Sequence, residues 1–266
     1  MRYLKGTAII ILLLLLTGCV AIAKSRKRPA LPQILRLSET IKISAVGAIV
    51  VNVPFIVNNV DFFPSGFKIE TRNRTIFIDP VLVSDRGSAD FILITHSHDD
   101  HCSIPDIKSL SKKETVVLCP KNVLKNVRKK LPDLLIKEIR PGEMLGFGDI
   151  DIQAVPAYNL KSGLFTPHPK SSLNVGYVII IDGMRIYHTG DTDYVPEMNS
   201  LGRITAAMVP IAGNDLTMST EKAAELINRL SPRYAIPMHY EIGTGELRRF
   251  KELGGKGAGV AVLDGQ

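Results

Sequence analysis

The sequence has only three cysteines in 266 residues, and it has no internal repeat. So few cysteines cannot build a disulfide framework. A composition of 45% hydrophobic and 22% charged residues excludes a disordered chain, a collagen-like chain and a coiled coil. The net charge of +7 suits anionic substrates or membrane headgroups, but it is too diffuse to predict nucleic-acid binding. The length predicts one large domain.

The N-terminal segment is basic and then apolar. Arg2 and Lys5 precede an apolar run over residues 7–23 that contains Leu16-Thr17-Gly18-Cys19. A basic start before a short apolar run predicts a secretory signal, because a membrane-spanning helix needs about 20 apolar residues. The ending resembles the lipobox of bacterial lipoproteins, in which the cysteine is lipidated. We therefore expect a signal peptide over residues 1–18 and a membrane-anchored lipoprotein facing the extracytoplasmic side.

An uncleaved membrane anchor is the alternative for this segment. Basic residues between positions 24 and 28 follow the apolar run and favour a cytoplasmic flank under the positive-inside rule. In either case residues 19–60 are expected to form a membrane tether and an N-terminal extension. Residues 41–60 within them predict one or two strands, or an arm packed on the surface.

The remainder of the chain predicts more strands than helices. Apolar runs predict strands, and apolar residues at helical spacing predict helices. The expected strands are residues 67–70, 75–78, 91–95, 115–119, 150–155, 175–181, 184–188, 206–211, 234–238 and 260–263, and the expected helices are residues 121–131, 220–230 and 246–253. This pattern is typical of a sheet-on-sheet core with helices outside, in the α/β or α+β class.

Three of the six histidines lie within the hexapeptide His96-Ser97-His98-Asp99-Asp100-His101. The hexapeptide follows an apolar strand, which would hold it at a sheet edge. Side chains at positions i and i+2 of an extended segment point the same way, so His96 and His98 can converge on one ion. Asp100 and His101 can face a second ion. Imidazoles with a carboxylate are the ligands that zinc and its neighbours prefer, so the hexapeptide predicts a metal site.

Two more candidate ligands end apolar strands. Asp191 follows Gly190, where the backbone can turn and present a carboxylate between two cations. His239 follows the strand expected over residues 234–238. His188 lies inside a strand, three residues before Asp191, and is expected to support the ligands or to belong to the core.

The motif His-x-His-x-Asp-His after a buried strand resembles the signature of the metallo-β-lactamase-fold hydrolases. Three further segments resemble those of the family in the same order: residues 76–80 (Ile-Phe-Ile-Asp-Pro), 187–193 (Tyr-His-Thr-Gly-Asp-Thr-Asp) and 236–240 (Ile-Pro-Met-His-Tyr). The resemblance covers residues 61–266 and implies a four-layer αββα sandwich for this domain. Within the family, the chain is similar to metal-dependent hydrolases related to sugar-phosphate lactonases and to phospholipase D-like enzymes.

The resemblance also implies a site for two divalent metal ions, zinc in the first place and manganese or iron as alternatives. His96 and His98 would bind the first ion. Asp100, His101 and His239 would bind the second ion, and Asp191 would bridge the two. Asp79 would lie behind the ligands and accept hydrogen bonds that orient them.

The third ligand of the first ion departs from the family pattern. The family has a histidine where this chain reads Ala157-Tyr158-Asn159. Two residues are candidates: Asn159, through its carbonyl oxygen, and His168, in the next loop. We favour His168, because imidazole is the better donor to zinc and the loop is long enough to fold back. Tyr158, Asn159, Lys161 and Lys170 are candidate substrate contacts from this loop.

The sequence thus predicts a membrane-attached hydrolase that acts on a small-molecule or lipid substrate. Two cations would lower the pKa of a shared water, and the resulting hydroxide would attack a carbonyl carbon or a phosphorus atom. Asp100 would orient the hydroxide or move its proton. A phosphodiester or phospholipid is the expected substrate, and a lactone or another carboxylic ester is the alternative. A non-catalytic, metal-binding envelope lipoprotein is the alternative from another class.

Overall fold

The computed structural model describes residues 21–24, 33–46, 49–53, 57–161, 163, 166–213, 216–254 and 257–263. The expected signal peptide and its Cys19 lie outside these residues. Within the described part, no helix combines the length and the hydropathy needed to cross a membrane.

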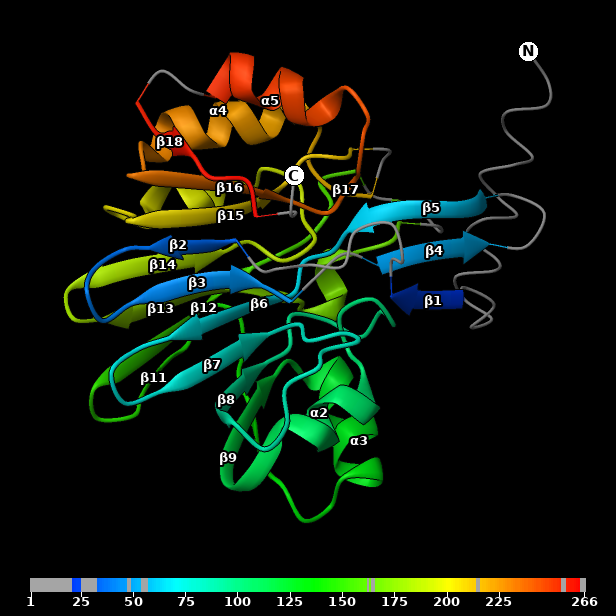
Figure 1. The fold of residues 1–266 in the computed structure, drawn as a ribbon, viewed down its shortest axis with the longest axis vertical. Helices are drawn as coiled ribbons and strands as arrows, with labels where there is room; N and C mark the ends of the chain where they lie inside the picture. The colour runs from blue at the N-terminus through cyan, green and yellow to red at the C-terminus, as the bar shows by residue number, and fades with distance from the viewer. Residues whose placement is uncertain are drawn as a thin grey trace.

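The first of two large sheets has the strand order β10-β9-β8-β7-β6-β3-β2 (Figure 1). Strands β7 to β10 run parallel, and β6, β3 and β2 continue the sheet antiparallel. The strands are β2 (Ile34–Arg36), β3 (Lys42–Ala45), β6 (Phe67–Glu70), β7 (Thr75–Ile78), β8 (Ala89–Leu93), β9 (Ser111–Cys119) and β10 (Leu135–Glu138). The sheet therefore takes in β2 and β3 from the segment that the sequence analysis assigns to the N-terminal extension.

The second large sheet has the order β11-β12-β13-β14-β15-β16-β18. Its strands are β11 (Met144–Gly146), β12 (Ile150–Pro156), β13 (Val175–Ile181), β14 (Met184–His188), β15 (Ala206–Pro210), β16 (Tyr234–Met238) and β18 (Gly259–Val260). Asp182 and Gly183 join β13 to β14 with positive φ angles of 48° and 72°. This is the backbone that a two-residue hairpin turn requires. From β14 onward the strands are parallel.

Helices cover the outer faces of both sheets (Figure 1). Residues of α2 (Ile104–Leu110) and α3 (Lys121–Lys130) pack in one apolar cluster with the first sheet. Residues of α4 (Thr220–Leu230) and α5 (Glu246–Gly254) pack on the second sheet, and the core between the two sheets belongs to the same cluster. The expected four-layer αββα architecture is confirmed.

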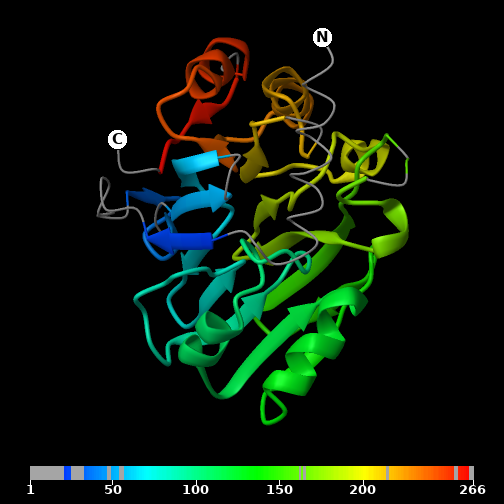
Figure 2. The same cartoon turned by 90° about the vertical axis from the view of Figure 1, so that its right-hand side faces the viewer.

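A third, smaller sheet lies to one side of the sandwich (Figure 1). Its order is β1-β4-β5-β17, formed by β1 (Ala21–Lys24), β4 (Ile49–Val53), β5 (Val57–Phe63) and β17 (Tyr240–Glu241). Residues 41–60, predicted as one or two strands or an arm, thus carry β3, β4 and most of β5. We call these four strands the small sheet. Figure 2 looks onto the side of the molecule where it lies.

Candidate metal centre

The expected ligands follow the carboxyl ends of strands from both large sheets. Asp79 follows β7, and the hexapeptide that begins at His96 follows β8. In the second sheet, Asp191 follows β14 and His239 follows β16. Carboxyl ends of parallel strands share one edge of a sheet, and this edge is where open α/β sheets bind ligands.

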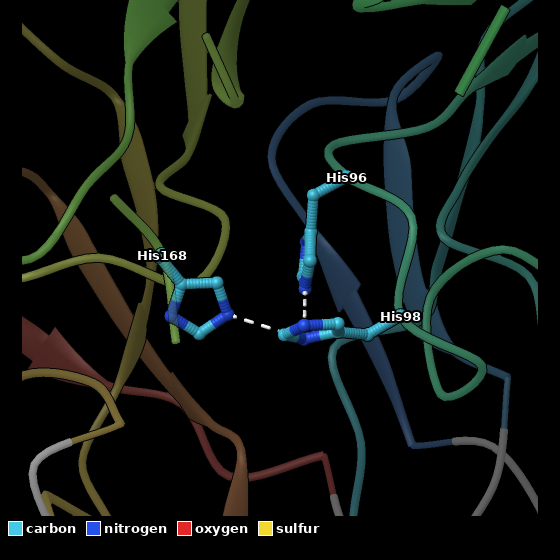
Figure 3. Close-up of side chains that lie close together, drawn as sticks. All are labelled: His96, His98 and His168. Carbon is cyan, nitrogen blue, oxygen red and sulfur yellow. Dashed lines mark hydrogen bonds between the residues drawn. The ribbon is translucent and has the colours of Figure 1, made fainter. Parts of the chain in front are cut away.

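One group of ligand atoms consists of three imidazoles. His96 Nε2 lies 3.0 Å from His98 Nδ1, and His168 Nε2 lies 3.3 Å from the same atom (Figure 3). The three ligand atoms lie within 4.8 Å of one another. His96 and His168 are buried, at 1% exposure each. Three nitrogens that face one point form a ligand set suited to zinc.

A second group consists of Asp100, His101 and His239, and Asp191 lies between the two groups. Asp100 Oδ2 is 3.6 Å from Nε2 of each of the two histidines. Asp191 Oδ2 is 3.0 Å from His239 Nε2 and 3.3 Å from His101 Nε2. The same oxygen lies 3.8 Å from His168 Nε2 and 4.0 Å from His96 Nε2. One carboxylate oxygen thus faces both groups.

His101 Nε2 and Asp191 Oδ1, like His239 Nδ1, are buried atoms of this cluster that lack a hydrogen-bond partner. An unsatisfied buried polar group costs about 1–3 kcal/mol, and a coordinated cation removes that cost. His101 Nε2 and Asp191 Oδ1 each carry a lone pair that a divalent metal ion can accept. The residues therefore fit a metal ion between His101 and Asp191.

Asp79 holds two of the histidines from behind. Its Oδ2 accepts hydrogen bonds from His101 Nδ1, at 2.8 Å, and from Thr95 Oγ1, at 2.6 Å. Its Oδ1 accepts from the Thr95 backbone N–H at 2.8 Å. Because the Thr95 hydroxyl donates to Asp79, it accepts from His96 Nδ1, at 2.9 Å. These contacts place the protons of both imidazoles on Nδ1 and leave both Nε2 lone pairs for the centre.

Asn159 holds His168 rather than joining the ligand group. Its Oδ1 accepts from the His168 backbone N–H at 3.0 Å, and its Nδ2 donates to the Leu216 carbonyl at 3.0 Å. His168 Nδ1 donates to the same carbonyl at 3.0 Å, so Nε2 is the free ring nitrogen. The structure thus brings His168, and not Asn159, to the position of the third ligand.

Of the other candidate substrate contacts, Tyr158 and Lys170 contact each other and Lys161 lies on the surface. The Tyr158 hydroxyl donates to Glu197 at 3.1 Å and accepts from Lys170 Nζ at 3.2 Å. Lys170 also lies 4.4 Å above the Tyr158 ring. These contacts join the loop after β12 to the 3₁₀ turn η2 (Pro196–Ser200). Lys161 is exposed.

His188 lies behind Asp191 and is not part of either ligand group. Its Nε2 donates to the Ser65 carbonyl at 2.8 Å, and its Nδ1 accepts from the Gly190 N–H at 3.1 Å. Both ring nitrogens are therefore used. Gly190 has a φ of 67°, and a Cβ there would lie 2.9 Å from the Val175 carbonyl oxygen. Only glycine fits this turn, which presents Asp191 to the centre.

Charges within the cluster shift its pKa values in opposite directions. Burial lowers the pKa of His101 and His239, but nearby carboxylates, Asp191 first, outweigh burial. They raise the pKa of His239 to about 9 and that of His101 well above its usual range. Burial raises the pKa of the Asp191 carboxyl, but His101 and His239 hold it well below its usual range. Burial lowers the pKa of His168 to about 4. In the metal-free protein, the raised pKa values thus favour protonated His101 and His239, whose positive charges stand where metal cations would fit.

We expect the metal-free protein to be most stable near pH 6.5, the ordinary pKa of histidine. The pKa of His239 is higher in the folded state, so its contribution is present below pH 6.5 and is lost as the pH rises through about 9; the pKa of His101 is raised in the same direction. His168 titrates lower, so its contribution is present above pH 6.5 and is lost as the pH falls through about 4. Thermal melts of chelator-treated protein across this range test the expectation. A melting temperature that rises steadily from pH 6.5 to 9 would contradict it.

Replacing Asn159 should weaken binding at the three-imidazole group selectively. Asn159→Ala removes the two side-chain hydrogen bonds by which Asn159 links the His168 backbone to Leu216, and losing such support typically costs 10–100-fold in metal affinity. Zinc titration with a competing chelator measures the loss of zinc affinity. Asn122→Ala is the matched control, because Asn122 also donates a side-chain amide bond, to Asn174 Oδ1 at 2.8 Å. Equal affinities for both variants would refute the role of Asn159.

Comparison with known proteins agrees with this fold. The family model of the beta-lactamase superfamily domain matches residues 62–239. A UPF0173 protein of Pyrococcus abyssi is 36% identical over 206 residues, which cover 74% of this chain and 91% of the relative. A UPF0173 metal-dependent hydrolase of Thermococcus onnurineus is 30% identical over 211 residues, which cover 72% and 89%.

Solved structures share the same fold. A candidate metal-dependent hydrolase from Parabacteroides distasonis superimposes with a TM-score of 0.70 and 27% identity, over 88% of this chain and 99% of that one. Fold and ligand groups together define a metal-dependent hydrolase of the metallo-β-lactamase superfamily. Within that superfamily, the chain belongs to the UPF0173 family.

Proposed function

We propose that this hydrolase binds two divalent cations, zinc by preference, and cleaves a phosphodiester of the phospholipid type at a membrane surface. The position of Asp191 is the observation that carries the two-ion proposal. One of its oxygens faces the imidazoles of both ligand groups, at distances from 3.0 to 4.0 Å. A single ion would use only one of the two groups, although the ligand atoms of each group lie within 4.8 Å of one another.

Bound cations would supply a water of lowered pKa and would polarise a substrate oxygen. The chain's own part is positioning and proton transfer. The Asp100 side chain is 28% exposed, whereas that of Asp191 is 3% exposed. Asp100 is therefore the carboxylate of the centre that reaches solvent, and we assign it the orientation of the attacking water and the transfer of its proton. Asp79 and Thr95 keep the His96 and His101 rings aligned.

The substrate class rests on charge and on the N-terminal segment. The net charge of +7 favours a phosphate-bearing substrate over a neutral ester. The apolar run over residues 7–23 favours a substrate that is present in a membrane. A phospholipid headgroup satisfies both conditions.

Metal analysis followed by a substrate screen tests this function. We expect about two zinc equivalents per chain and turnover of phosphodiesters above that of lactones, thioesters and β-lactams. One equivalent at saturation would refute the two-ion proposal. Turnover confined to lactones or other carboxylic esters would refute the substrate class and leave the hydrolase intact.

Acyl labelling of cells tests the mode of membrane attachment. We propose that Cys19 is lipidated, so Cys19→Ser should abolish labelling. Labelling that persists in this variant would refute the lipoprotein. A chain that takes up no acyl label but still fractionates with membranes would instead support the single N-terminal anchor.

A further inference from the structure

We infer that the side of the molecule that carries the metal centre lies against the membrane, so that a lipid substrate enters directly from the headgroup layer. The inference rests on the proposed membrane attachment and deepens it. We define the membrane-facing side as the small sheet, the loop of residues 157–174 and the first turn of α3. Figure 2 looks onto this side.

The small sheet connects the N-terminal segment to the centre. Strand β1 begins at Ala21, within the apolar run, and Lys24 pairs with Ile49 of β4. Ile49 pairs with Phe62 of β5, and Phe62 pairs with Glu241 of β17. Three strand spacings separate β1 from β17, which is a distance of about 15 Å.

Strand β17 begins one residue after a ligand of the second group. His239 immediately precedes Tyr240, and the Phe62 ring packs edge-on against the His239 ring with centroids 4.9 Å apart. A lipidated Cys19, two residues before β1, would therefore hold the centre close to the lipid headgroups. Strand β1 and the strand that follows His239 belong to one sheet.

Exposed leucines lie at both ends of the loop that carries His168. Leu160 is 58% exposed, and its backbone N–H donates to Asp193, two residues after Asp191. Leu173 is 42% exposed at the other end of the same loop. Between them, His168 reaches the three-imidazole group. Exposed apolar side chains beside a catalytic centre are unfavourable in water but are accommodated at a lipid interface.

Helix α3 adds positive charge to this side. Of its five cations, Lys121 and Lys125 lie toward this side and are exposed, whereas Arg128, Lys129 and Lys130 lie in the last turn; the helix has no acid. Asn122, in the first turn, donates to Asn174, which links this end of the helix to the 157–174 loop. No ion pair involves the five cations within the described part of the chain. Anionic headgroups complement such a surface.

Depth-dependent fluorescence quenching tests this orientation. The chain has no tryptophan, so a single introduced indole reports alone. We would reconstitute full-length Leu160→Trp into phosphatidylglycerol–phosphatidylcholine vesicles that carry a lipid with a quencher near its headgroup. Leu135→Trp and Met144→Trp are the controls, because these side chains are 49% and 60% exposed and lie outside the membrane-facing side. We expect several-fold stronger quenching of Leu160→Trp than of either control.

The outcomes separate this inference from the proposed function. Equal quenching of the three variants in vesicle-bound protein would refute the orientation and leave membrane attachment intact. Protein that does not float with the vesicles would refute the attachment itself. Stronger quenching at position 160 that persists in a Lys121→Glu/Lys125→Glu background would support the orientation and assign it to the leucines. Quenching lost in that background would support the orientation and assign it to the cations.

Discussion

The Asp191→Asn variant should lose hydrolysis by about a hundred- to a thousandfold, the range seen when a key electrostatic group of an active site is removed. It should also fail to hold two metal equivalents. Asparagine keeps the shape of the side chain but removes the charge that faces four imidazole nitrogens at 3.0–4.0 Å. Metal analysis and turnover of the preferred substrate measure both effects.

Asp182→Asn is the matched control for this variant. Asp182 carries the same charge and lies in the exposed β13–β14 turn, where asparagine also adopts the positive φ of 48°. We expect normal metal content and activity in the control. An Asp191→Asn protein that binds two ions and keeps its activity would remove Asp191 from the centre.

Asp79→Ala should produce the largest loss of stability. Asp79 is fully buried and accepts three hydrogen bonds, two from Thr95 and one from His101. Removing one partner from a buried charged network costs about 3–5 kcal/mol, which is a large share of the 5–15 kcal/mol that typically stabilises a domain. Urea unfolding of the metal-free variant measures the cost apart from metal binding.

An exposed ion pair provides the comparison for Asp79. Asp149 pairs with Arg74 at 3.1 Å, and both side chains are more than a third exposed. Asp149→Ala should change stability by less than about 1 kcal/mol, because water already solvates the pair. Similar losses for the two variants would show that the Asp79 network adds nothing beyond a surface contact.

Most elements of the sandwich could be predicted because their signals are local. The apolar run before the hexapeptide and the Asp182-Gly183 turn both depend on neighbouring residues only. Helix α2 was missed, although Ser103 caps it by accepting from the Asp106 N–H. Its seven residues are too short for a helical period to stand out against the adjacent histidine motif. The small sheet was also missed, since β17 has two residues and depends on pairing with β5.

For the candidate centre too, local patterns could be predicted, whereas contacts between distant segments could not. The spacing within the hexapeptide predicts that its histidines and Asp100 are metal ligands. The structure brings these side chains together with Asp191 and His239. The choice between His168 and Asn159 depended on how a loop folds back. In the structure the Leu216 carbonyl, far away in sequence, accepts from both side chains, and His168 Nε2 faces the other two imidazoles. The Tyr158 hydroxyl is engaged by Lys170 and Glu197, and its contact with substrate stays a prediction.

The division of the ligands between the two large sheets affects how the protein unfolds. The first sheet supplies the hexapeptide, and Asp191 and His239 come from the second. Neither half of the sandwich retains a full coordination sphere when the other separates from it. Bound metal would therefore crosslink the two halves, and metal release would report the opening of the interface between the sheets. A fragment that ends before β12 would hold the signature histidines and yet bind metal only weakly.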